Sequence, residues 1–223
     1  MGFTPLNPRM ILASAVLNLL AVGVIRVIMA CDPDPLQDYC VTDVQSSLSI
    51  NGFACKTSVS SADFSSALLT GPKSTANALG ISVTLAGAAN FGGLNTQGLS
   101  VARLDYGVSG LVPPHVHPRA SEVLFVLKGR IYAGFVTGSN QLFAQTLKPF
   151  DIFVFPRGLV HFSVNVGKHS AISISGLNSQ NPGLSLVANA LFASNATIPD
   201  FILEKALKLT EAEVEKIKAA FKG

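Results

Sequence analysis

The sequence lacks tryptophan and is poor in charge, because only 13% of its 223 residues are acidic or basic. It has no stripe of basic residues with interleaved aromatics, so nucleic acid is not an expected partner. It also has neither a G-x-G-x-x-G motif nor a Walker-type lysine, and the glycine-bearing stretch 87–98 is therefore read as a loop. No repeat or linker divides the chain. With 48% apolar residues, it is long enough for one ordered all-β domain or at most two small domains.

The first thirty residues have the pattern of a secretory signal. They contain two basic residues, Arg9 and Arg26, and no acid, and residues 11–25 are mostly apolar. Fifteen residues at ~1.5 Å each fall short of a ~30 Å membrane core. We therefore predict a signal peptide over 1–30 that ends at the small residue Ala30, with no stable membrane insertion after its removal. An uncleaved anchor or a buried core helix is the alternative, because Arg26 interrupts the run late. Removal would leave 14 basic and 13 acidic residues, so the pI of 8.8 does not indicate nucleic acid.

The three cysteines become candidate disulfide partners if the chain is secreted, since thiols oxidise in that pathway. A bridge between Cys40 and Cys55 would close a loop worth ~3 kcal/mol in the chain-entropy model. Cys31, beside the expected cleavage point, could instead pair with Cys40. Asn195 begins an Asn-Ala-Thr triplet, which is an acceptor for an N-linked glycan.

The middle of the chain alternates apolar and polar residues in short segments, as antiparallel strands of a sandwich or barrel do. Segments 124–127 and 131–136, joined by 128–130, are predicted to form a hairpin. Three further segments are predicted as strands: 151–155, 160–166 and 170–175.

The pattern changes to helix from Pro199 onward. Thr197 with Asp200 and Thr210 with Glu213 each fit a capping box. The apolar positions that follow are spaced as on one helix face. Such helices could dock on a neighbouring subunit or pack on their own barrel.

Two histidines stand at positions i and i+2 in the segment Pro-Pro-His-Val-His, so on a strand His115 and His117 share one face. Glu122 lies five positions after His117, an offset that a straight strand would send to the opposite face. Pro118 and Arg119 favour a bend that can return the carboxylate to the imidazoles.

A third histidine, His161, opens another predicted strand, on the face opposite Phe162 and Val164. Three of the four histidines and one of only five glutamates thus fall in two short segments. Three imidazoles and a carboxylate suit a divalent first-row ion, with the carboxylate favouring Mn or Fe, although Zn, Cu and Ni also bind imidazole. The fourth histidine, His169, is read as an ordinary turn residue.

These segments resemble the two metal boxes of plant germins and germin-like proteins, a family of the cupin superfamily. Residues 32–40 (DPDPLQDYC) and 51–56 (NGFACK) resemble the mature start and the second cysteine box of that family. The resemblance implies an all-β fold, a cupin jelly-roll β-barrel over about 60–180 with C-terminal helices over about 183–222. The whole of 31–223 would then form a single domain.

The same resemblance implies a metal site, a disulfide, an extracellular location and an oligomeric assembly. It implies manganese held by His115, His117, Glu122 and His161, and a disulfide joining Cys40 to Cys55. Members of the family are typically extracellular glycoproteins assembled as hexamers, each a trimer of dimers.

Three positions depart from the family pattern. Members that oxidise oxalate carry asparagines where this chain has Ala102 and Val112. Each hydrogen bond that oxalate could not make there costs on the order of 1 to 3 kcal/mol, so we do not expect oxalate oxidase activity. Phe150 replaces a glycine of the family box, so a turn at positive φ is expected to be made differently.

The leading functional hypothesis is a secreted germin-like protein of the apoplast that dismutes superoxide through the metal, with a role in defence or wall development. A site of this kind could admit superoxide with little further recognition. One alternative is a non-catalytic, wall-associated or ligand-binding cupin whose ion only ties strands together. Oxalate oxidase, or another activity on a small phosphorylated or phenolic molecule, is the remaining alternative.

Overall fold

The structure is a computed structural model that describes residues 52–53 and 55–221 of the chain. These residues all belong to one compact unit, Asp34–Gly223. The predicted signal peptide over 1–30 and two of the cysteines, Cys31 and Cys40, lie outside the described residues. Within the described part, no helix combines the length and the apolar character needed to cross a membrane.

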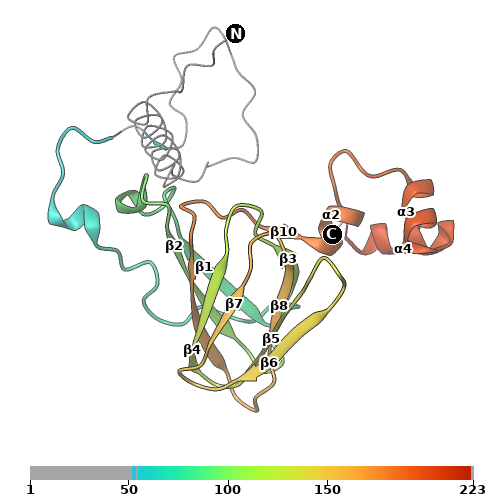
Figure 1. The fold of residues 1–223 in the computed structure, drawn as a ribbon, viewed down its shortest axis with the longest axis horizontal. Helices are drawn as coiled ribbons and strands as arrows, with labels where there is room; N and C mark the ends of the chain where they lie inside the picture. Colours follow the sequence, from blue (N-terminus) through green and yellow to red (C-terminus); the bar gives the residue numbers. More distant parts are fainter. Residues whose placement is uncertain (1–51, 54, 222–223) are drawn as a thin grey trace, which may run out of the picture. The chain divides into compact units, whose positions relative to one another are not determined.

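In the described part of the chain, ten strands form two antiparallel five-stranded sheets (Figure 1). The first sheet has the order β1 (Ile81–Ala86), β2 (Ser100–Tyr106), β9 (Ala171–Leu177), β4 (Glu122–Lys128) and β7 (Ile152–Phe155). The second has the order β10 (Ser185–Leu186), β3 (Leu111–Val116), β8 (Val160–Asn165), β5 (Ile131–Val136) and β6 (Leu142–Leu147). This is the predicted jelly-roll architecture, and the all-β assignment with C-terminal helices is confirmed.

Both sheets send apolar side chains into a common core. Leu124 and Val126 of β4 are 0% exposed, as are Ile131 and Ala133 of β5. Every second residue of these strands points inward because successive side chains of a strand alternate between its faces. Fully burying one such leucine or isoleucine contributes ~1.5–3 kcal/mol, which makes this alternation the main reason the chain adopts strands here.

The predicted hairpin between 124–127 and 131–136 is wrong, although both segments are strands. β4 pairs with β7 and β9, whereas β5 pairs with β6 and β8 in the other sheet. The chain changes sheet at Gly129, which has a φ of 90°. A Cβ atom at this position would lie 2.4 Å from the Cβ of Ala171, so the corner requires glycine.

Five short helices complete the described part. They are the 3-10 turns η1 (Ser61–Phe64) and η2 (Gly92–Leu94) and the α-helices α2 (Val187–Phe192), α3 (Asp200–Leu207) and α4 (Glu211–Ala220). α2 contacts β3 and β10, and α3 packs against α4. The predicted strands and the C-terminal helices are thus present, with ends that differ by a few residues.

Of the two predicted capping boxes, one forms. Thr210 accepts from the backbone N–H of Glu213, whose carboxylate in turn accepts from the Thr210 N–H. The box at Thr197 is wrong, because α3 begins at Asp200 after Pro199 and has no side-chain cap. The carboxylate of Asp200 instead accepts from the buried ammonium of Lys218 on α4, which ties the two helices together.

Phe150 makes its turn in an unexpected way. The sequence suggested that a residue other than glycine would avoid a positive φ here, but Phe150 adopts a φ of 74°. The residue is 76% exposed, and its ring contacts the ring of Phe125. A bulky residue in this region of φ is strained.

Candidate metal centre

An extra residue in β3 sets the inward face of this strand. Val112 lies opposite Ser163 of β8, and His115 lies opposite His161, so three steps along β3 match two steps along β8. Such a bulge re-aims the side chains that follow it. The two prolines between Val112 and His115 fit this position because they could not donate ladder hydrogen bonds. As a result, both Val112 and His115 are buried inside the barrel.

His117 and Glu122 lie on either side of a turn. His117 directly follows β3, and Glu122 is the first residue of β4. The bend predicted between them is present, and it places Glu122 inside the barrel with 6% exposure. His115 and His161 lie on the paired strands β3 and β8 of one sheet, with His117 just after β3, whereas Glu122 lies on β4 of the other sheet.

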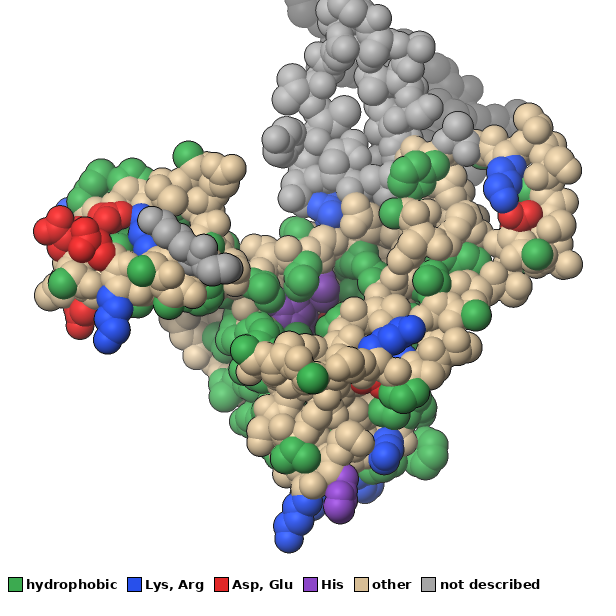
Figure 2. All heavy atoms as spheres, turned by 180° about the vertical axis from the view of Figure 1, so that it is seen from behind, with side chains coloured by type: hydrophobic (Ala, Val, Ile, Leu, Met, Phe, Trp, Pro, Cys, Tyr) green, Lys and Arg blue, Asp and Glu red, His purple; other side chains and the backbone are tan. Residues whose placement is uncertain are grey.

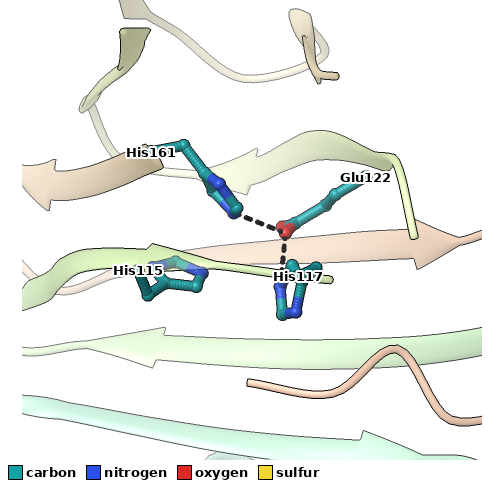
Figure 3. A group of neighbouring side chains, drawn as sticks. All are labelled: His115, His117, Glu122 and His161. Carbon is teal, nitrogen blue, oxygen red and sulfur yellow. Dashed lines mark ion pairs between the residues drawn. The ribbon is translucent and has the colours of Figure 1, made fainter. Parts of the chain in front are cut away.

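The four side chains converge on one point (Figure 3). One possible ligand atom from each lies within 4.8 Å of the others. The Glu122 Oε2 atom is 3.0 Å from Nε2 of His117 and 3.4 Å from Nε2 of His161. The rings of His115 and His161 lie with their centroids 4.0 Å apart. His117 and His161 are distant in the sequence, and the pairing of β3 with β8 brings them together.

Each imidazole is held by a hydrogen bond from its Nδ1–H to a backbone carbonyl, which can only accept. In the neutral ring, this bond fixes the tautomer and leaves the lone pair on Nε2. The acceptors for His115, His117 and His161 are, in order, the oxygens of Pro113 at 2.9 Å, Gly183 at 2.5 Å and Leu159 at 2.8 Å.

A metal ion fits this arrangement because the donors present are those it would need. The Nε2 atom of His161 is buried and has no hydrogen-bond partner, although Glu122 lies nearby. Buried polar atoms without partners are rare, and a metal would use this lone pair directly. Three imidazole nitrogens and one carboxylate oxygen form a donor set for a first-row divalent ion.

Burial and mutual contact shift the pKa values of these groups. Desolvation lowers the pKa of His115 to about 4, helped by the neighbouring His161. Desolvation also opposes the charged form of His117, but its hydrogen bonds to Glu122 and to the Gly183 carbonyl outweigh this and raise its pKa. Burial works against the Glu122 carboxylate, yet the hydrogen bond from His117 and the nearby ring of His161 keep its pKa well below the usual value.

The four side chains lie at the floor of a cavity of about 450 Å³. A space-filling view shows imidazoles at the bottom of a hollow surrounded by hydrophobic side chains (Figure 2). Ala102 and Val112, the positions expected to bear on oxalate, both line this cavity, with exposures of 6% and 8%. Apart from the metal-binding group, the polar side chains in the lining are Ser163 and Asn181.

The remaining predicted positions lie away from this group. His169 is exposed and does not join it, as the sequence indicated. Asn195 is exposed, which leaves it accessible for a glycan. Cys55 is exposed, and its predicted partner Cys40 lies outside the described residues.

Sequence reasoning missed the residues that support the group. Gly183 supplies the carbonyl that orients His117 from 66 residues away. Its Pro-Gly step signals a turn in the sequence, but nothing there indicates what the turn approaches. The wall residues Leu85 and Leu184 were likewise missed, since only the fold brings them over the metal-binding group.

Known proteins match this chain over most of its length. Residues 67–215 match a family model described as Cupin. The chain is 43% identical over 211 residues to Nectarin-1 of Nicotiana plumbaginifolia, covering 95% of this chain and 92% of that protein. It is 47% identical over 199 residues to Germin-like protein 8-2 of Oryza sativa subsp. japonica, covering 86% and 90%. Among solved structures, an oxalate oxidase in complex with the substrate analogue glycolate has a TM-score of 0.76 and 39% identity, covering 86% of this chain and 99% of that one.

Proposed function

Because this chain belongs to the germin-like proteins of the cupin family, we propose that it is a secreted manganese protein of the plant extracellular matrix that dismutes superoxide. The observation that carries this proposal is the convergence of three Nε2 atoms and one carboxylate oxygen within 4.8 Å of one another. Roles in defence or wall development belong to the same proposal.

His115, His117, His161 and Glu122 would hold the ion. Manganese is the proposed ion because a carboxylate among the ligands favours it over softer metals. When bound, it supplies the alternation between two oxidation states by which two superoxide ions and two protons give one dioxygen and one hydrogen peroxide.

The chain itself prepares the site for this chemistry. The carbonyls that accept from Nδ1 keep all three Nε2 atoms directed at the shared point, so little reorganisation is needed on binding. The low pKa of Glu122 keeps a negative charge among the imidazoles at all ordinary pH values. The cavity leads to this point and would admit a diatomic anion without specific contacts.

Oxalate is a poor substrate for this cavity, despite the similarity to an oxalate oxidase. Ala102 and Val112 present only methyl groups where the resemblance associates asparagines with oxalate. A dianion placed against them would lose hydrogen bonds made in water, at on the order of 1 to 3 kcal/mol each. We therefore propose that oxalate oxidation is absent or very weak.

The test combines metal analysis with two assays on the same secreted, purified protein. We expect bound manganese, superoxide consumption that resists cyanide and peroxide, and no hydrogen peroxide release from oxalate. His115→Ala should lose both metal and activity, whereas the matched control His169→Ala should keep both. Activity that survives loss of the metal would refute the mechanism, and metal without turnover would favour a non-catalytic binding cupin.

We also propose a homo-oligomer, a hexamer built as a trimer of dimers. α3 exposes apolar side chains that the neighbouring helix does not cover, among them Phe201 at 68% and Ile202 at 44% exposure. Covering such a surface with a second copy would remove it from water. Light scattering of the purified protein should give six chain masses, and Phe201→Asp should lower that mass. A monomeric wild type would refute this assembly.

The covalent modifications remain part of the proposal. A Cys40–Cys55 disulfide and a glycan at Asn195 both fit secretion. Mass spectrometry of peptides from the secreted protein, with and without reduction and with glycan release, tests each of them directly.

A further inference from the structure

The end of the barrel opposite the metal-binding group carries a cluster of exposed cationic side chains. β4 begins at Glu122 in the metal-binding group and ends at Lys128, and its six steps of ~3.3 Å separate the two residues by about 20 Å. Lysine, arginine and histidine side chains gather at the lower tip of the barrel (Figure 2). We call this surface the basic tip, and its members, all exposed, are Lys128, Arg130, Lys148, Lys168 and His169.

Strand pairing holds the three loops of the basic tip side by side. β5 begins just after Arg130 and pairs with β6 on one side and with β8 on the other. Lys148 directly follows β6, and the loop 166–170 directly follows β8. Neighbouring strands lie ~4.8 Å apart, so Arg130 lies between the other two loops. The cluster is thus assembled by the fold from segments that are distant in the sequence.

The loop that carries Lys168 and His169 is fixed by a buried side chain. Asn165 is 2% exposed, and its Nδ2 donates to the carbonyl of His169 at 2.8 Å and to the carbonyl of Gly107 at 2.7 Å. Its Oδ1 accepts from the backbone N–H of Gly167 at 2.9 Å. Because this backbone is already ordered, a ligand that binds here does not bear the entropy cost of ordering the loop.

The positive charge of the basic tip is not neutralised nearby. Among the described residues, none of its lysine or arginine side chains forms an ion pair. The one acid in the loops 128–130, 148–151 and 166–170 is Asp151, whose carboxylate accepts from the backbone N–H of Lys148 at 3.0 Å. By contrast, α4 carries three glutamates beside its lysines, so both signs are mixed there. A surface of one sign attracts a partner of the opposite sign.

From this arrangement we propose that the basic tip binds an acidic polysaccharide, a linear polymer of uronic acids. Carboxylates that repeat along such a chain can meet cations from all three loops at once. The inference deepens the proposed function and rests on its extracellular location, but it uses neither the metal nor dismutase activity. A polymer held at this end leaves the cavity over the metal-binding group, at the other end of β4, open to small molecules.

Two other polyanionic partners suit the basic tip less well. Single-stranded nucleic acid gains affinity when its bases stack on aromatic side chains, but the ring of the neighbouring Phe150 lies against Phe125. Proteins that bind an anionic lipid surface commonly do so through an amphipathic helix, and the described residues of the basic tip are all in strands or loops.

The experiment is a binding titration of the manganese-loaded protein, freed of excess metal, with polygalacturonate as the probe. The fully methyl-esterified polymer keeps the sugar chain but lacks the charge, and we expect it not to bind. Raising the salt concentration from about 0.05 M to about 0.5 M should weaken polygalacturonate binding at least tenfold, because exposed charges are screened. Equal binding of the esterified polymer would overturn the proposal. So would tighter binding of single-stranded DNA or of phosphatidylserine vesicles at the same charge concentration.

A matched pair of double variants locates the surface. Arg130→Gln with Lys168→Gln removes two charges of the basic tip and should weaken polygalacturonate binding at least about fivefold. Lys205→Gln with Lys216→Gln removes the same charge from exposed positions on α3 and α4 and should leave the affinity as in the wild type. Equal weakening by both pairs would assign the binding to net charge and overturn the proposal. Unfolding midpoints that match the wild type show that each variant is folded.

Superoxide assays on the same preparations separate the two proposals. Protein that binds polygalacturonate through the basic tip but does not consume superoxide supports the polysaccharide site and refutes the dismutase. Protein that consumes superoxide but does not bind the polymer overturns the polysaccharide site alone.

Discussion

Metal binding should weaken as the pH falls, and protonation of His117 should set the pH at which the affinity begins to fall. In the metal-free protein the pKa of His117 is raised above its ordinary 6.5, mainly because Glu122 accepts its hydrogen bond against the cost of burial. A metal ion must displace the proton that His117 carries below that pKa. Below the pKa of His117, competition from this proton alone lowers the apparent affinity for the metal tenfold for each pH unit.

His115 behaves in the opposite way. Its pKa of about 4 means that protonation costs ~3 kcal/mol more than for an imidazole in water. It therefore stays neutral through the range in which His117 titrates and adds its own competition only below about pH 4. Glu122 remains ionised throughout, because its pKa is lowered.

The assay is manganese affinity from pH 4 to pH 8, paired with NMR titration of the histidine rings in metal-free protein. Glu122→Gln keeps the shape of the side chain but removes the charge, so the pKa of His117 should fall and manganese affinity should drop at least tenfold. Glu215→Gln, at an exposed position on α4, should change neither. An affinity that does not vary with pH between 5 and 7, or a His117 titration unmoved by Glu122→Gln, would refute this reasoning.

Three further predictions concern stability, each measured by chemical denaturation. Phe150→Gly should stabilise the protein by about 1 kcal/mol, because relief of the strain at a φ of 74° exceeds the entropy cost of glycine; a lower stability would show that the exposed ring matters more than the backbone. Leu124→Ala should cost about 2–5 kcal/mol, since this side chain is fully buried between the sheets, and a loss below 1 kcal/mol would contradict a close-packed core. Tyr106→Phe should cost about 1–2 kcal/mol by leaving the Ser163 hydroxyl without its partner, and an unchanged midpoint would mean that another group replaces the phenol.

The ligand set could be predicted from the sequence because its geometry is local. His115 and His117 share a face through the two-residue period of a strand, and the alternation around His161 places it inward. The structure has both arrangements. The sequence did not indicate that an added residue in β3 would turn Val112 inward as well.

Strand pairing could not be predicted in the same way. The segment between β4 and β5 has a composition typical of a hairpin turn, and only contact between Gly129 and Ala171 of β9 reveals a corner between sheets. The strands β1, β2 and β6 were not predicted. Two of them, β1 and β6, lie at sheet edges, and most of their residues are only partly buried or exposed, so they lack a clear alternation of apolar and polar positions. Similarly, the capping box at Thr197 does not form, and the Asp200 carboxylate instead accepts a hydrogen bond from Lys218 on another helix.

The division of the donors between the sheets, three nitrogens on one and one oxygen on the other, has a consequence for exchange of the ion. A motion that widened the barrel would draw the lone oxygen away, while the nitrogens of His115 and His161 would stay together on the paired strands β3 and β8. Release of the ion is then expected to start with loss of that oxygen, at a rate governed by the slow opening of the whole barrel rather than by fast rotation of one side chain. An ion trapped in this way would remain bound long after it has left the surrounding solution.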